Sequence, residues 1–82
     1  MSDCWKIVVR GVRSPYAFTY IGYGEHQDAI EGAIRTFFLL FPQAVKDGYR
    51  VYMLEGDNVK FLFEEKARNA RMLLKMFQHG EL

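Results

Sequence analysis

The sequence contains few of the residues on which secreted scaffolds and metal sites depend. Its 82 residues include one cysteine, Cys4, so no disulfide can form within the chain, whereas small secreted domains usually carry several. The two histidines, His26 and His79, are far apart and form no pair at metal-ligand spacing. We therefore expect a protein of the reducing cytoplasm that holds neither a metal nor another cofactor.

Long hydrophobic runs are also missing. The longest strongly apolar run covers residues 37–41, far short of the ~20 residues that cross a bilayer, so we expect no membrane partner. The first residues do not show the basic and then apolar pattern of a secretory signal. Both observations favour the same cytoplasmic location.

Neither sign of charge dominates. The chain has 11 basic and 10 acidic residues and a net charge of +1, whereas nucleic-acid-binding domains usually have a clear basic excess. Hydrophobic residues make up 50% of the chain and aromatic residues 16%. A chain of this length buries only about 60% of its unfolded surface. So much aromatic surface therefore favours a protein partner or a second copy of the chain.

What the sequence does contain is a strand–turn–strand–helix unit that occurs twice, over residues 5–41 and 49–77. Each copy begins with an aromatic, a basic and a branched aliphatic residue, and each closes with a helix ending in phenylalanine. Alternation of apolar and polar side chains marks the strands, and apolar steps of three and four mark the helices. These patterns predict strands at 5–10, 16–23, 49–54 and 59–63, a hairpin turn at 55–58, and helices at 25–41 and 64–78.

The two units together predict a single domain of residues 1–82. Its fold class is α+β, a ββαββα two-layer sandwich in which a four-stranded antiparallel sheet has two helices on one face. Which face of the second strand is buried stays open, because both alternating sets contain aromatics. The predicted core is Trp5, Ile7, Val9, Ile30, Ile34, Phe37, Phe41, Val51, Met53, Phe61, Phe63, Leu73, Leu74 and Phe77.

The sheet face away from the helices is the most informative predicted surface. Aliphatic side chains, a tyrosine and arginines together are what protein interfaces favour. The candidate partner-binding residues are Val8, Arg10, Arg50, Tyr52, Leu54, Lys60 and Leu62. A second, basic candidate surface lies along the last helix at Arg68, Arg71 and Lys75. Basic and aromatic side chains could also bind single-stranded nucleic acid, which is the alternative function.

No motif for catalysis stands out. Cys4 with His26 or His79 as base would need an orienting group and an oxyanion hole, and no local pattern marks either. The three acidic residues at 25–31 and the two at 64–65 suit helix starts, where the dipole favours negative charge. We therefore predict no catalytic, cofactor-binding or metal-binding residues, and a non-enzymatic protein.

The strand–strand–helix run at 5–41 and the hairpin at 49–63 give the chain an outline that resembles small single-domain inhibitors. Such proteins are used by bacteriophages and mobile elements to block host defences, and the anti-CRISPR proteins are among them. The resemblance implies a cytoplasmic inhibitor that binds the surface of a larger host protein or complex. It assigns no contact residue. A homodimer, formed through the same sheet face, stays open as well.

Overall fold

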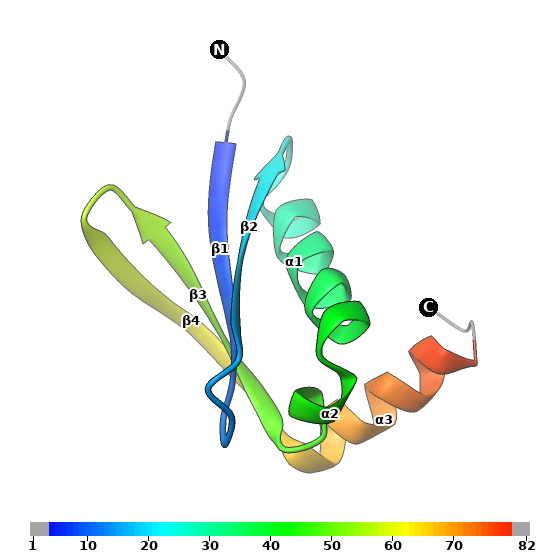
Figure 1. Cartoon of the computed structure of the whole chain (residues 1–82). Helices are drawn as coiled ribbons and strands as arrows, with labels where there is room; N and C mark the ends of the chain where they lie inside the picture. Colours follow the sequence, from blue (N-terminus) through cyan, green and yellow to red (C-terminus); the bar gives the residue numbers. More distant parts are fainter. Residues whose placement is uncertain (1–3, 80–82) are drawn as a thin grey trace.

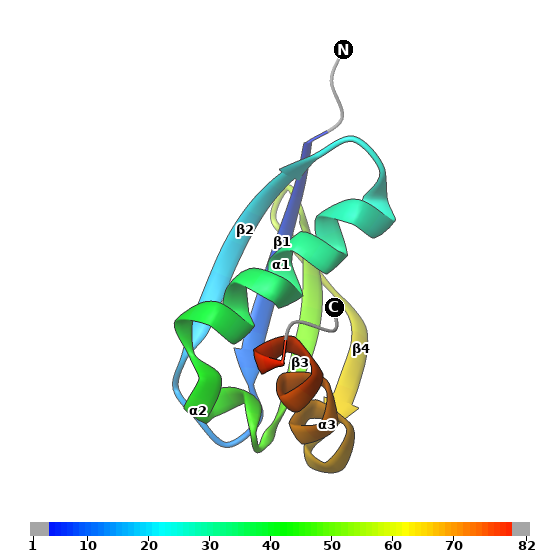
Figure 2. The same ribbon diagram turned by 90° about the vertical axis from the view of Figure 1, so that its right-hand side faces the viewer.

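The sheet at the centre of the molecule is antiparallel throughout, with the strand order β2-β1-β3-β4. The computed structural model describes residues 4–79. All helices lie on one side of the sheet (Figures 1 and 2), which confirms the predicted α+β fold. Its elements are β1 (Cys4–Gly11), β2 (Ala17–Tyr23), α1 (His26–Leu40), α2 (Pro42–Val45), β3 (Gly48–Glu55), β4 (Asn58–Lys66) and α3 (Ala67–Gln78).

The first hairpin shows why β2 was hard to orient from its sequence. Ile7 and Val9 of β1 are fully buried, and directly paired residues lie on the same face of a sheet. Tyr20 pairs with Ile7 and Phe18 with Val9, so these two aromatics point toward the helices. The other alternating set of β2, which includes Ile21, points away from them.

Helix α1 packs closely on β2 because two glycines let it approach. A Cβ atom on Gly22 would lie 2.7 Å from the Cβ of Ala29, and one on Gly32 would lie 2.6 Å from the hydroxyl of Tyr20. Both distances are shorter than van der Waals contact. Gly32 therefore weakens the isolated helix but permits its position over Tyr20.

Two segments differ from the predicted boundaries. A short helix, α2, occupies part of the expected connection: Pro42 at its first turn suits a helix start, and its Ala44 and Val45 are buried. The last helix begins at Ala67 rather than at residue 64. Glu64, Glu65 and Lys66 stay in β4 because the start of β3 offers them pairing partners.

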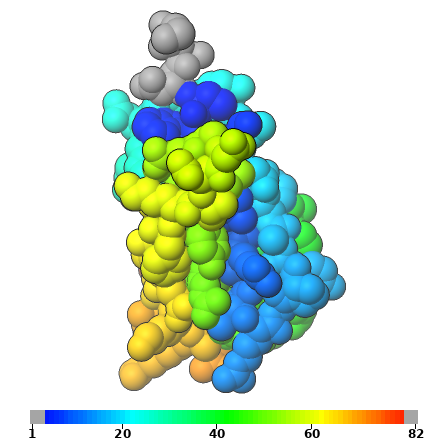
Figure 3. Space-filling model, turned by 90° about the vertical axis from the view of Figure 1, so that its left-hand side faces the viewer, coloured from blue at the N-terminus to red at the C-terminus, as the bar shows by residue number. Residues whose placement is uncertain are grey.

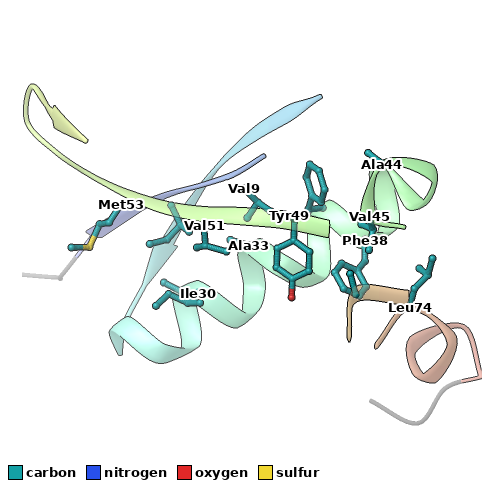
Figure 4. Packing of buried hydrophobic residues seen from close by; sticks show 14 residues of the cluster. Val9, Ile30, Ala33, Phe38, Ala44, Val45, Tyr49, Val51, Met53 and Leu74 are labelled. Carbon is teal, nitrogen blue, oxygen red and sulfur yellow. The ribbon is translucent and has the colours of Figure 1, made fainter. Parts of the chain in front are cut away.

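The core lies between the sheet and the helices (Figure 4). Of the predicted core residues, Ile7, Val9, Ile30, Phe37, Val51, Met53 and Leu74 are buried. Trp5, Ile34, Phe41, Phe63, Leu73 and Phe77 are partly buried and pack around them. The prediction missed Phe38, Ala44, Val45 and Tyr49, which are buried. It was wrong about Phe61, whose side chain is 53% exposed.

Candidate functional site

We call the sheet face opposite the helices the open face. Its residues follow from the register, because the direct neighbours of an outward residue also point outward. Val8 pairs with Thr19 on one side and Tyr52 on the other, and Lys6 pairs likewise with Ile21 and Leu54. The open face comprises Cys4, Lys6, Val8, Arg10, Ala17, Thr19, Ile21, Tyr23, Arg50, Tyr52, Leu54, Val59, Phe61, Glu64 and Lys66.

Figure 3 looks onto this face. β4 runs down its left side in yellow, β3 and β1 lie in the middle, and β2 runs down its right edge in light blue. Atoms of the helices appear only at the rim of this view. Within residues 4–79, no helix covers the open face, and no helix is long and apolar enough to span a membrane.

A β-bulge in β4 changes which side chains this face presents. Val51 pairs with Phe63, but the next residue, Tyr52, pairs with Phe61. Leu62 is therefore an extra residue in β4, and the alternation of the strand reverses there. Leu62 packs against the core.

The bulge corrects part of the predicted site. Lys60 pairs with the inward residue Met53, so Lys60 lies on the helix side rather than on the open face. Leu62 also leaves the open face. In their place stand Val59, opposite Leu54, and Phe61, opposite Tyr52. The other five candidates, Val8, Arg10, Arg50, Tyr52 and Leu54, do lie together on the open face.

The exchange makes the face more apolar than the sequence indicated. Tyr52 and Phe61 meet edge to face, with ring centroids 5.6 Å apart. Val59 and Phe61 are exposed, and so are Ile21 and Tyr23 on β2. Val8, Tyr52 and Leu54, between these strands, are half-buried by their neighbours. An apolar band therefore crosses all four strands.

The charged end of the open face is partly neutralised. The Arg50 Nε donates to the Glu64 carboxylate over 2.6 Å. This hydrogen bond and the negative charge of Glu64 raise the pKa of Arg50 above its ordinary value. Arg10, which pairs with Arg50 across β1 and β3, adds a second positive charge. Both side chains lie at one end of the apolar band. A third cation, the exposed Lys6 on β1, stands within the band between Ile21 and Leu54.

The second candidate surface lies elsewhere. Arg68, Arg71 and Lys75 are all exposed on α3, which is on the helix side of the sheet (Figure 2). Arg71 nevertheless lines one hollow with Glu64 of the open face, together with Arg13, Asp47 and Lys66. The two surfaces therefore meet at this end of the sheet.

A groove between α1 and α3 was not foreseen from the sequence. It has a volume of ≈ 290 Å³ and is lined by Glu31, Ile34, Arg35, Phe38, Tyr49, Leu73 and Phe77. Tyr49 extends from β3 into the core beside Phe38 (Figure 4). Burial, and to a smaller extent the charge of Glu65, raises the pKa of the Tyr49 hydroxyl well above its ordinary value.

Cys4 and His26, the thiol and base considered from the sequence, lie on opposite faces of the sheet. Cys4 is exposed and pairs with Tyr23 on the open face. His26 is on the other side of the sheet, where its ring packs 4.7 Å from that of Trp5 and its Nε2 lies 3.1 Å from the Met53 sulfur. In the part of the chain that the structure describes, no three His, Cys, Asp or Glu residues gather to hold a metal ion.

No protein-family model, no curated protein and no solved structure matches the chain.

Proposed function

We propose that the protein is a non-enzymatic binding module whose open face docks on another protein. One observation carries the proposal: the apolar band that runs from Ile21 to Phe61 has no helix over it among the described residues. Aromatic and aliphatic side chains at the centre with arginines at the rim form the usual composition of a protein interface. The Tyr52–Phe61 pair, on β3 and the edge strand β4, is an aromatic contact within the band and the expected hot spot.

The charges of the face favour protein over nucleic acid as its ligand. Single-stranded nucleic acid needs a basic groove along its backbone beside the stacking aromatics. The bulge turns Lys60 away from this face, and Glu64 neutralises Arg50. Lys6, Arg10 and Lys66 remain as its cations outside the Arg50–Glu64 ion pair, which is a small basic surface for phosphate binding.

The proposal extends to the kind of partner. The outline-level resemblance to anti-CRISPR-type inhibitors suggests a partner in a host defence protein or complex, which the module would block by covering its surface. The two-layer α+β outline supports this reading. Affinity capture from a bacterial lysate, with mass spectrometry before and after nuclease treatment, identifies the partner.

The contact surface is tested with the captured partner. The double variant Tyr52→Ala with Phe61→Ser should weaken binding at least about 30-fold, since hot-spot truncations cost ~2 kcal/mol or more. Met72→Ser is a matched control, because Met72 is 55% exposed but lies on α3. The control should bind like the wild type. Equal affinity of the double variant and the wild type, measured by titration calorimetry, would refute the proposed contact surface.

A further inference from the structure

The two edges of the sheet are protected to very different degrees. β4, at one edge, carries a bulge and the charged residues Lys60, Glu64 and Lys66, which are the usual protections against pairing with another strand. β2, at the other edge, reads AFTYIGY. It has no charged residue, no proline and an uninterrupted register with β1. The edge at β2 is therefore open to a further strand.

The hydrogen-bond pattern shows which groups this edge offers. Gly11 N–H donates to the Tyr16 carbonyl, and Val12 N–H donates to the Gly48 carbonyl, each over 3.1 Å. Because bonded and non-bonded pairs alternate in an antiparallel ladder, the even-numbered residues of β2 bond to β1. The N–H and C=O groups of the odd-numbered residues 17, 19, 21 and 23 point outward.

We propose that β2 pairs with β2 of a second copy of the chain, antiparallel and centred on Tyr20. This register uses every outward group and forms about eight main-chain hydrogen bonds. It also matches side chains by size: Phe18 lies opposite Gly22 of the second copy, and Ala17 lies opposite Tyr23. No like charges meet, since the strand has none.

Exposed apolar side chains around β2 favour the pairing of this edge with another strand. Tyr16, Ile21 and Tyr23 are more than half exposed, and so is Leu40, which lines a hollow with Tyr16 beside the end of α1. Large apolar side chains beside an open strand edge favour association. Pairing of two copies would place these side chains at the new interface.

Helix α1 lies close to β2 and would take part in this arrangement. α1 passes over Tyr20 at Gly32, and a hollow of ≈ 190 Å³ lies there between Asp28, Glu31, Gly32 and Arg35. A two-fold axis at Tyr20 brings the α1 helices of both copies together at their Gly32 residues. They run antiparallel, so Asp28 of one copy approaches Arg35 of the other. This pair attracts across the interface, whereas Glu31, which lines the same hollow beside Gly32, approaches its counterpart near the axis and opposes the attraction.

The test compares prolines at the two edges. Thr19→Pro removes one outward N–H of β2 and leaves the ladder to β1 intact, since proline is tolerated on edge strands. Val59→Pro makes the same change on β4, where the N–H also points away from the sheet. By light scattering over a concentration series, the wild type and Val59→Pro should reach about twice the chain mass of 9.6 kDa, and Thr19→Pro should stay monomeric. Circular dichroism verifies that each variant is folded.

If Thr19→Pro does not fold, a crosslinking experiment tests the β2–β2 pairing. In a Cys4→Ser background, copies with Thr19→Cys are mixed with copies with Ile21→Cys and oxidised. The proposed register predicts a mixed disulfide dimer, and little dimer from either copy alone. A wild type that stays monomeric at every concentration overturns the proposal, and so does equal crosslinking in all three samples. An extended peptide of another protein that pairs with a monomeric β2 counts against it too.

This inference shares Ile21 and Tyr23 with the proposed function, but the two are tested at different residues. The dimer test depends on Thr19 of β2, and the binding test depends on Tyr52 of β3 and Phe61 of β4. A failed dimer test therefore leaves the binding proposal standing, and a failed binding test leaves the dimer standing.

Discussion

At the scale of single residues, burial of Tyr49 makes its hydroxyl harder to ionise in the folded protein. Its ring is 1% exposed, and burial, assisted by the charge of Glu65, raises the pKa of its hydroxyl above the usual ~10. The folded state therefore keeps the proton at a pH at which the unfolded state has lost it. Stability from this group is complete below about pH 10 and falls as the pH rises further.

Tyr49→Phe tests this linkage. In the wild type, the free energy of unfolding should fall by about 1.4 kcal/mol between pH 8 and pH 11 through this group alone. The free energy of unfolding of Tyr49→Phe should not show this decrease. Urea denaturation of both proteins at the two pH values measures the difference. Parallel losses in the two proteins would show that Tyr49 ionises as freely in the folded state as in the unfolded one.

At the scale of elements, α3 begins without the usual stabilising groups. Its N-cap is Lys66, which makes no side-chain hydrogen bond to the helix, and its first turn has no acidic residue. A lysine here also opposes the positive end of the helix dipole. The sequence suggested that Glu64 and Glu65 serve this end, but both stay in β4.

Lys66→Ser should therefore stabilise the protein. A serine at the N-cap accepts a hydrogen bond from the first turn, which adds ~1 kcal/mol to the free energy of unfolding. Lys66→Ala is the control, because it removes the charge without adding a cap. Urea denaturation should rank serine above alanine. If the two variants are equally stable, relief of the unfavourable charge accounts for the whole effect.

The second hairpin shows what could be predicted from the sequence and what could not. Alternation gave the faces of β3 correctly: Val51 and Met53 are buried, while Arg50, Tyr52 and Leu54 face outward. The same rule failed in β4, because alternation assumes one residue for every partner and Leu62 has none. A bulge depends on how both ends of a strand are held, and no local pattern specifies it.

The turn between β3 and β4 contains a sequence signal for the register of this hairpin. Gly56 has φ +62° and is the first residue of a two-residue loop between Glu55 and Asn58, a position that favours glycine. A two-residue Gly-Asp loop fixes Glu55 opposite Asn58. Counting back from that pair places Val59 opposite Leu54 and Phe61 opposite Tyr52. Turn chemistry would thus have found the two missed residues of the open face.

At the scale of the whole molecule, the charges are dispersed rather than gathered. The cations of Arg68, Arg71 and Lys75 lie on the helix side, those of Lys6 and Arg10 lie on the open face, and the net charge is +1. Where Arg13, Lys66 and Arg71 line one hollow, Asp47 and Glu64 line it too and offset most of their charge. Association through the open face should depend mainly on apolar contact.

Partner binding should accordingly change less than about tenfold between about 50 and about 200 mM salt. A nucleic-acid ligand neutralised by six or more cations would lose roughly a thousandfold over that range. Titrations of the captured partner at several salt concentrations make the measurement, with Arg10→Ala as the variant that should alter any residual slope. A steep slope that nuclease treatment abolishes would favour the nucleic-acid alternative.

The bulge in β4 also means that this hairpin has a second possible register. If the extra residue moved from position 62 into the turn, the loop would become Gly56-Asp57-Asn58 and Phe63 would remain opposite Val51. Lys60 and Leu62 would then stand on the open face in place of Val59 and Phe61. A substitution that favoured the longer loop would thereby replace an aromatic side chain on the open face with a leucine and a valine with a lysine. One change in a turn would thus alter the chemistry of a surface several residues away.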